Sequence, residues 1–425
     1  MAASPDTATA AKHAIPRAPE FDGTLALLRD GYDYIARRRH RLGSNVFRTR
    51  LMLRDVLCMG GAEAARFFYD GDRFTRTGAA MPGRVVKLLQ DKGSVQMLDD
   101  AAHRQRKAMF MGLMTEPSIA RLTELFSRHW QLVAAQWPQR QPVRLFDEVN
   151  GIIARAVCEW TGAPLASIDA GALTRSLSDM IEMVSVLGPA YWQARWRRRQ
   201  TERWAGSLIE DARAGRLNIS PEAPLMRIAQ HRDLDGQPLS VEAAAVELIN
   251  LLRPTVAVGH FIVFAAHALH SLPDLAKGLD PHADRDLEAF AQEVRRYYPF
   301  FPFIGGIARE MLAFEAFAIP PGQWVLLDLH GTNHDPQIWP EPNAFRPERF
   351  SAWDNDLYTL VPQGAGNVFT GHRCPGERIT LELTKKATSL LLCMHYRVPE
   401  QDLSIKLNRM PTLPESGFAI DHVRL

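Results

Sequence analysis

The sequence predicts a mainly α-helical protein with small β-sheets. Apolar residues recur at spacings of three and four over most of residues 61–298, which is the pattern of amphipathic helices. Strand-like runs are confined to residues 46–58, residues 304–330 and the last 30 residues. Neither a linker nor an internal repeat divides residues 19–425, so we expect one domain, preceded by a disordered Ala-, Ser-, Thr- and Pro-rich stretch at residues 1–18.

In chain order, residues 22–40 are expected to form an amphipathic helix, and residues 46–58 a short pair of strands. The clearest helical patterns lie in four segments, at residues 117–136, 144–161, 167–186 and 192–215. Strand-like sequence returns at 304–330, and Pro and Asn become frequent after it. A last long helix is expected over residues 378–394.

The composition limits the classes of function. With 46% hydrophobic residues and a net charge of +2, the chain can bury a large core and gives no reason to expect a nucleic-acid partner. The arginine-rich run at residues 195–199 is expected to be a solvated helix face rather than a binding patch. Residues 1–18 contain neither a signal-peptide core nor an apolar membrane span, so we expect a cytoplasmic protein without a transmembrane anchor.

One of the four cysteines stands in an unusual setting. Cys58, Cys158 and Cys393 have apolar neighbours and are expected to be inert core residues, and four scattered cysteines do not indicate a disulfide framework. Cys374 instead follows a Gly-rich run at residues 363–366 and precedes the helix expected at 378–394. Loop N–H groups and a helix N-terminus stabilise a thiolate, which can be the axial ligand of a haem iron. A buried structural cysteine is the alternative interpretation.

The longest apolar helical pattern, at residues 241–270, carries Arg253 followed by Pro254 at its middle. A helix that is apolar on nearly all sides is buried, and a buried guanidinium needs a carboxylate. The residues three or four positions away are not acidic, and Glu247 lies about 120° around the helix from Arg253. The missing carboxylate therefore belongs either to a distant segment or to the substrate, which Arg can hold through two parallel hydrogen bonds.

Two further motifs precede the Cys374 loop at ordered spacing. They are Glu293-x-x-Arg296 and Phe345-x-Pro-x-Arg349-Phe350. Together with the cysteine loop they resemble the cytochrome P450 superfamily over essentially the whole chain. The resemblance implies the cytochrome P450 fold, haem b with iron bound by Cys374, and an ion-pair network of Glu293, Arg296 and Arg349 behind the haem.

The resemblance can be narrowed to one subfamily. Most members carry an acid–alcohol pair in the long helix, where this chain has Arg253-Pro254, and the cysteine loop here is longer. Both features, with the segments 297–300, 328–335 and 410–418, resemble the bacterial fatty-acid peroxygenases. This implies hydrogen peroxide and a fatty acid as reactants without a redox partner, and hydroxylation at the α or β carbon with possible minor decarboxylation. The substrate carboxylate, held by Arg253, would be the acid–base group.

The same resemblance assigns further residues. Gln96 stands where the subfamily has Gln or His over the haem, and Gln favours hydroxylation over decarboxylation to alkenes. Leu89 and Phe300 are expected to contact the substrate. The candidate partners of the haem propionates are His372, Lys107, His103, Arg106 and Arg76.

Two residues depart from the subfamily pattern. Gln90 stands where an apolar residue is common and Phe301 where Gly is expected, so the pocket could have another shape or accept shorter chains.

Two other functions remain as alternatives. One is a reductase-driven cytochrome P450 monooxygenase that acts on another carboxylic acid, and the missing acid–alcohol pair argues against it. The other is a haem-thiolate sensor without turnover, which the complete set of haem motifs does not exclude.

Overall fold

The structure is a computed structural model that describes residues 14–78, 80–91 and 93–424. Residues 1–13 of the stretch predicted to be disordered lie outside the described residues. The prediction does not hold for residues 16–18, which run beside the first strand. The N–H of Ala18 donates to the carbonyl of Arg48 at 2.9 Å, and the N–H of Arg48 donates to the carbonyl of Pro16 at 2.8 Å.

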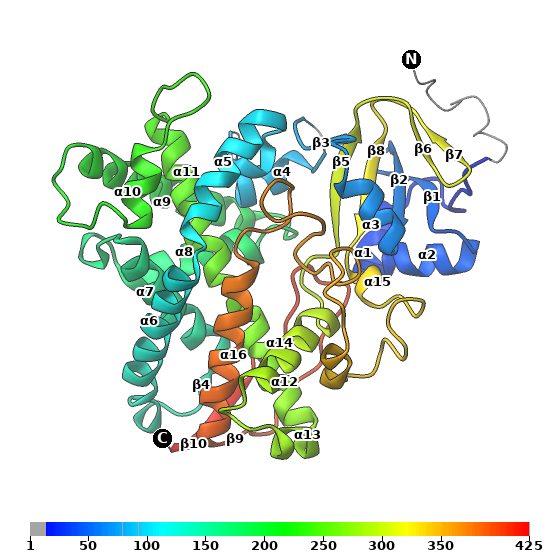
Figure 1. Ribbon diagram of the computed structural model, residues 1–425. Coiled ribbons are helices and arrows are strands. Elements are labelled where there is room, and N and C mark those ends of the chain that lie inside the picture. The colour runs from blue at the N-terminus through cyan, green and yellow to red at the C-terminus, as the bar shows by residue number, and fades with distance from the viewer. Residues whose placement is uncertain (1–13, 79, 92, 425) are drawn as a thin grey trace.

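Helices form most of the molecule, as predicted (Figure 1). Figure 1 shows α6 to α11 on one side of the molecule, the largest sheet on the other, and α16 between them. The long helices are α5 (Asp100–Leu113), α6 (Glu116–Ala134), α7 (Leu145–Thr161), α8 (Ala170–Glu182), α9 (Pro189–Arg213), α11 (Val241–Val256), α12 (Val258–Ser271), α14 (Asp284–Tyr297) and α16 (Glu377–Cys393). The shorter ones are α1 (Thr24–Asp30), α2 (Tyr34–Leu42), α3 (Ala62–Tyr69), α4 (Gly83–Val85), α10 (Pro224–Gln230), α13 (Pro273–Gly278) and α15 (His330–Asn333).

The largest sheet has five strands in the order β1-β2-β8-β5-β3. They are β1 (Val46–Leu51), β2 (Arg54–Gly60), β3 (Phe74–Thr75), β5 (Phe303–Ala308) and β8 (Trp324–Asp328). Only β2 and β8 are parallel, with Val56 opposite Trp324. The remaining strands form a three-stranded sheet of β4 (Val143–Arg144), β10 (Ala419–Arg424) and β9 (His395–Arg397), and a hairpin of β6 (Leu312–Phe314) and β7 (Phe317–Ile319).

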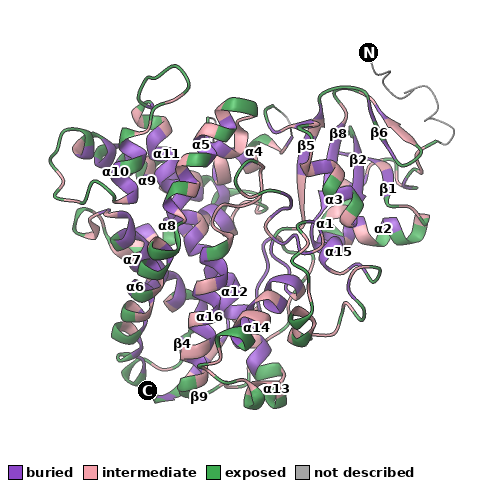
Figure 2. Ribbon diagram, viewed as in Figure 1, coloured by how far each residue is buried: buried purple, intermediate pink, exposed green. Residues whose placement is uncertain are grey.

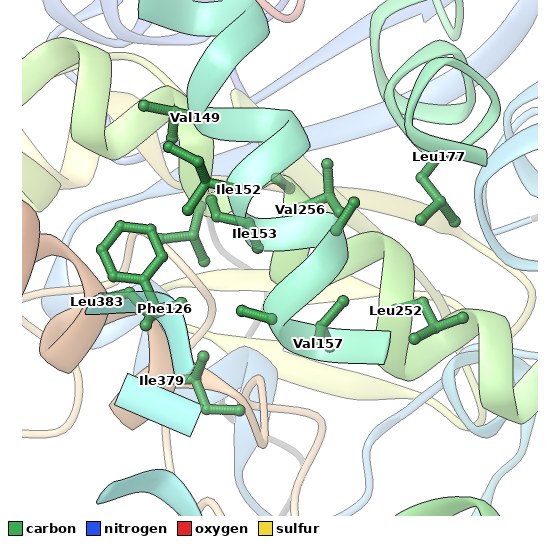
Figure 3. Close-up of a cluster of buried hydrophobic side chains, with 14 of the residues drawn as sticks. Phe126, Val149, Ile152, Ile153, Val157, Leu177, Leu252, Val256, Ile379 and Leu383 are labelled. Atoms are coloured by element: carbon green, nitrogen blue, oxygen red, sulfur yellow. The ribbon is translucent and has the colours of Figure 1, made fainter. Parts of the chain in front are cut away.

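Part of the main core lies where five helices meet. Figure 3 shows side chains of α6, α7, α8, α11 and α16 packed together, among them Phe126, Ile153, Leu177, Val256 and Leu383. Figure 2 shows that α12 and the strands β2 and β8 are also largely buried. The core therefore surrounds α11 and α12, which cross the middle of the molecule.

The helix predicted over residues 241–270 is divided into α11 and α12 at Ala257. Pro254, three residues earlier, lacks the N–H that would bond the carbonyl of Asn250, which loosens the helix at this point. Ser240 caps the start of α11 by accepting the N–H of Ala243 at 3.1 Å. In the described residues, α11 and α12 form the one helical stretch long and apolar enough to cross a membrane, and 94% of its most apolar window is buried.

Three other predictions need correction. The helix expected at 22–40 is divided at Gly31, where a 3-10 turn (Gly31–Asp33, η1) separates α1 from α2. Cys393 is exposed at the end of α16, although Cys58 and Cys158 are buried as predicted. Arg198, in the run taken as a solvated face, is 1% exposed, because it turns inward to bond Glu202 and the carbonyl of Leu88.

Candidate active site

The main cavity lies between α11, the loop that carries Cys374, and two short segments, η2 (Val86–Gln90) and η3 (Val95–Met97). The structure brings most of the predicted site residues to its wall. These are Arg76, Leu89, Gln96, His103, Lys107, Arg253, Pro254, Phe300, His372 and Cys374. Gln90 and Phe301, which depart from the subfamily pattern, also line it. Residues up to about 300 positions apart in the chain thus share one site.

Cys374 is held by its loop three residues before α16. Its N–H donates to the carbonyl of Gln363 at 3.0 Å, and the side-chain amide of Gln363 lies 3.8 Å from the sulfur. Gly364 has a φ of 95°, which a residue with a side chain rarely adopts, so this turn requires glycine. Burial raises the pKa of the Cys374 thiol, while Lys107 and the N–H of Gly376 lower it. The loop therefore aims a sulfur with stabilising donors into the cavity.

Buried ion pairs fix the base of this loop. Glu377, the first residue of α16, accepts hydrogen bonds from Arg373 and from Arg295 of α14. These partners hold the pKa of Glu377 below its usual value despite its burial. Arg295 was not predicted as a site residue, although it directly precedes Arg296 of the Glu-x-x-Arg motif. Its position within that motif was the one signal in the sequence that could have indicated it.

Four basic side chains line the same cavity as Cys374. The rings of His103 and His372 stack with centroids 3.8 Å apart, and Lys107 donates to the carbonyl of Arg373. Arg76 donates to the carbonyl of Gly305 at 2.6 Å. Burial lowers the pKa of Lys107 to about 8 and that of His103 to about 4. Desolvation is the main cause of both shifts, and for His103 the neighbouring cations Lys107 and Arg76 lower the pKa further.

The donor set fits haem. A half-buried thiol faces a cavity whose wall carries four basic side chains, and Asp99, which lies 3.9 Å from His372, is also bonded to other groups. Asp99 accepts the N–H of Arg76 at 2.9 Å and the hydroxyl of Thr77 at 2.7 Å. The cluster can therefore receive the two propionates of a haem whose iron lies at Cys374.

Arg106 is a correction to the predicted propionate partners. It lies one residue before Lys107 on α5 but is absent from the cavity wall. Its guanidinium donates to Glu247 at 2.7 Å and to Asp233 at 2.6 Å. Adjacent helix residues point about 100° apart, so Lys107 and Arg106 face different sides of α5.

Arg253 is 4% exposed, and its Nη1 has no hydrogen-bond partner among the described residues. Burial and the nearby Arg198 lower the pKa of its guanidinium, and the interaction with Glu247 offsets this lowering only in part. Glu247, the nearest acid on α11, is occupied by Arg106, by the N–H of Val95 and by Asn250. The described chain therefore contains no acidic side chain that pairs with Arg253, which leaves a substrate carboxylate as its expected partner.

The wall around Arg253 contains three more polar atoms without a partner in the described chain. They are side-chain oxygens of Gln90, Gln96 and Asn250. Asn250 was not predicted as a site residue. It lies three positions before Arg253 on the same helix face, and because its amide nitrogen donates to Glu247 at 2.9 Å, its oxygen is left for the cavity.

The predicted ion-pair network is present behind the cavity. Arg296 binds both carboxylate oxygens of Glu293, at 2.6 and 2.8 Å, and Arg349 lies 3.4 Å from the same carboxylate. Arg296 also donates to the carbonyls of Asn333 and Pro342, both at 2.9 Å. The network thus joins α14 to the segment between β8 and the cysteine loop.

Comparison with known proteins agrees with this geometry. The sequence model "Cytochrome P450" matches residues 287–418. Variants of cytochrome P450SP alpha (CYP152B1) superpose with a TM-score of 0.92 at 43% identity, over 95% of this chain and 99% of theirs. The chain belongs to the cytochrome P450 superfamily.

Comparison with other cytochromes P450 indicates the subfamily to which the chain belongs. Cytochrome P450EX alpha (CYP152N1) with myristic acid is 39% identical, and a variant of cytochrome P450 OleT with arachidonic acid is 33% identical. Both superpose with a TM-score of 0.92 over 97% of this chain and 99% of theirs. A putative cytochrome P450 135B1 of Mycobacterium bovis is only 22% identical, over 85% of this chain and 81% of its own. The predicted fatty-acid peroxygenase subfamily is confirmed, and the protein is a haem oxidoreductase.

Proposed function

We propose that this cytochrome P450 uses hydrogen peroxide to hydroxylate fatty acids at the α or β carbon. The observation that carries the proposal is the unpaired Nη1 of Arg253 in the cavity that also contains the Cys374 thiol. Buried cations without a countercharge are costly, so a carboxylate ligand relieves the cost when it binds. The fatty acids bound to related structures have such a group.

Residues of this chain would hold both the iron and the propionates of haem b. Cys374 would bind the iron, and Lys107, His103, His372 and Arg76 would meet the propionates. Haem with a thiolate ligand supplies the oxygen-transfer chemistry, since the thiolate favours cleavage of the O–O bond.

Arg253 would hold the substrate carboxylate through two parallel hydrogen bonds. Leu89 and Phe300 would pack against the chain, because both offer apolar surface to the same cavity. With the head group fixed beside α11, the α and β carbons are the part of the chain closest to it. Oxidation is therefore expected at these carbons rather than at the far end.

The acid–base group would be the substrate carboxylate itself. Glu247 is engaged with Arg106 and Asn250, so it is not free to exchange protons in the cavity. An oxygen of the bound carboxylate can take a proton from hydrogen peroxide and return it. The resemblance to the fatty-acid peroxygenases, in which Gln at the position of Gln96 goes with hydroxylation and His with more decarboxylation, supports hydroxylation as the main reaction.

Peroxide brings both oxidising equivalents, so a redox partner is not needed in this proposal. The acid–alcohol pair that serves reductase-driven relatives is replaced by Arg253 and Pro254. We place the reaction in the cytoplasm.

The test uses the purified holoenzyme with a fatty acid and hydrogen peroxide, without any reductase. The expected products are 2- and 3-hydroxy acids. The matched control is the primary alcohol of the same chain length, which lacks the carboxylate and is expected to remain unchanged. Turnover only with a reductase, or binding without turnover under both conditions, would replace the proposal by one of the two alternatives.

A further inference from the structure

The exposed side of α9 combines indole rings with arginines near its start. Trp192 is 70% exposed and Trp196 is 59% exposed. Arg199 and Arg203 continue the series at spacings of three and four residues, so these four side chains lie on one side of the helix. Together with Arg195, Lys87 and Leu187 they form what we name the Trp–Arg face.

The charge of this face is not neutralised. Residues 189–201 contain four arginines and neither aspartate nor glutamate. Two of the arginines turn away, since Arg197 pairs with Asp179 and Arg198 with Glu202. Arg199 has neither a hydrogen bond nor an ion pair with any described residue, and Arg195 donates to a backbone carbonyl. Exposed positive charge therefore surrounds two exposed indoles.

The Trp–Arg face covers the outside of the cavity wall. Arg195 donates to the carbonyl of Lys87 at 3.1 Å, and Arg198 donates to that of Leu88 at 2.6 Å, which fastens α9 to η2. Lys87 is exposed, whereas the next residues of the same segment, Leu89 and Gln90, line the cavity. The loop before α9 adds Leu187, which is 74% exposed. One thin segment thus separates this face from the substrate cavity.

We propose that the Trp–Arg face docks the enzyme on an anionic lipid bilayer. Indole rings favour the boundary between head groups and acyl chains, and arginines attract anionic head groups. A second copy of the chain is a poor occupant, because a symmetric contact would bring the arginines of the two copies together. Docking here would place the wall formed by η2 at the surface where fatty acids are concentrated. The inference goes beyond the proposed function and does not require it.

The test measures binding of the holoenzyme to vesicles without substrate or peroxide. Phosphatidylcholine vesicles with and without phosphatidylglycerol are sedimented, and the bound fraction is determined. We expect binding to the anionic vesicles that weakens with salt. Replacing Arg199 and Arg203 by Gln should weaken it about 25-fold, at about fivefold for each arginine. Trp192→Ala combined with Trp196→Ala should reduce it at least about tenfold, because two partly embedded rings are lost.

A matched control replaces another exposed arginine and another exposed apolar residue, with Arg121→Gln and Leu132→Ala on α6. This variant should bind vesicles as the unchanged protein does. Haem absorption and peroxide-driven turnover of a dissolved short-chain acid verify that each variant is folded. Failure of the unchanged protein to bind anionic vesicles overturns the proposal, as does equal loss in the control variant. A dimer that the tryptophan variant converts to monomers, without vesicle binding, also overturns it.

Discussion

The two walls of the cavity differ in how their polar groups are satisfied. Around Cys374, the side-chain amide of Gln363 reaches the sulfur, and Arg373 donates hydrogen bonds to Glu377. Around Arg253, the side chains of Arg253, Gln96, Gln90 and Asn250 each keep a buried polar atom without a partner in the described chain. A permanent group needs a rigid, complete support, whereas a ligand that comes and goes must supply the missing partners itself. The wall around Cys374, which we name the anchoring wall, is therefore suited to hold a permanent group. The wall around Arg253, which we name the receiving wall, is suited to bind a ligand reversibly.

The largest effect is expected at the anchoring wall. Cys374→Ala removes the thiolate, so the variant should lose all peroxide-driven hydroxylation and the reduced carbon monoxide absorption typical of thiolate ligation. Absorption spectra and product analysis measure both losses. Cys393→Ala, at an exposed cysteine, is the control and should leave the spectrum unchanged. An unchanged spectrum in the Cys374 variant would refute the ligand assignment.

At the receiving wall, Arg253→Ala should keep haem bound but lower the rate of fatty-acid hydroxylation about 10²- to 10⁴-fold, the range for loss of an acid–base group. The reason is that the carboxylate is no longer held beside the reacting atoms. Arg253→Lys keeps the charge but loses the paired hydrogen bonds, so its rate of hydroxylation should lie between those of the unchanged protein and the Ala variant. Steady-state rates and the haem spectrum separate loss of activity from loss of haem. Near-normal turnover in the Ala variant would contradict the proposed carboxylate site.

Glu247 joins the receiving wall to α5 through its ion pair with Arg106. The second partner of Arg106, Asp233, offers a matched control. Glu247→Gln leaves a buried charge on Arg106 and should lower the free energy of unfolding by about 3 kcal/mol. Asp233→Asn removes the other, half-exposed partner of Arg106 and should cost less than about 1 kcal/mol. Denaturant unfolding compares the two variants. Equal losses would show that burial of the Glu247 pair does not decide its contribution.

The buried carboxyl of Asp328 lies outside both walls, so a ligand in the cavity cannot supply its missing hydrogen-bond partner. The side chain of Asp328 accepts the N–H of Gly331 at 2.8 Å, but its other oxygen has no partner in the described chain. Burial raises the pKa of this carboxyl from 3.8 to about 7. Between these values the folded protein binds more protons than the unfolded chain, so the free energy of unfolding should fall as the pH rises from about 4 to about 7.

Asp328→Asn removes this titration. The variant should lack that part of the decline, which amounts to at most about 1.4 kcal/mol per pH unit for one proton. Unfolding measured across this range in both proteins tests the expectation. Parallel curves for the two proteins would show that Asp328 is not the group that titrates.

The smallest effect concerns the product ratio. Gln96→His places a titratable ring in the receiving wall and should raise the alkene fraction, with hydroxylation still detectable. Gln90→His introduces the same ring at another cavity-lining glutamine and should leave the ratio nearly unchanged. Chromatography of the products from one fatty acid measures both. Equal shifts in the two variants would show that the position of Gln96 is not special.

Much of the fold and site could be predicted from local sequence. The helical periodicity, the paired strands at β1 and β2 and the loop around Cys374 all depend on neighbours close in the chain. Predictions failed where contacts from distant segments decide. Residues 16–18 are held by β1, and Arg198 is drawn inward by η2, which lies about 110 residues earlier. Periodicity does not record such contacts.

Arg106 and Lys107 show which part of the site the sequence determines and which part depends on the tertiary structure. The sequence alone determined that a thiolate loop and a buried arginine without a local acid occur in one chain, because both signals are complete within a few residues. Only the tertiary structure decided which basic residues face the cavity. Helix geometry separates the two side chains by about 100°, and Glu247, 141 residues away, takes Arg106 and leaves Lys107 beside Cys374.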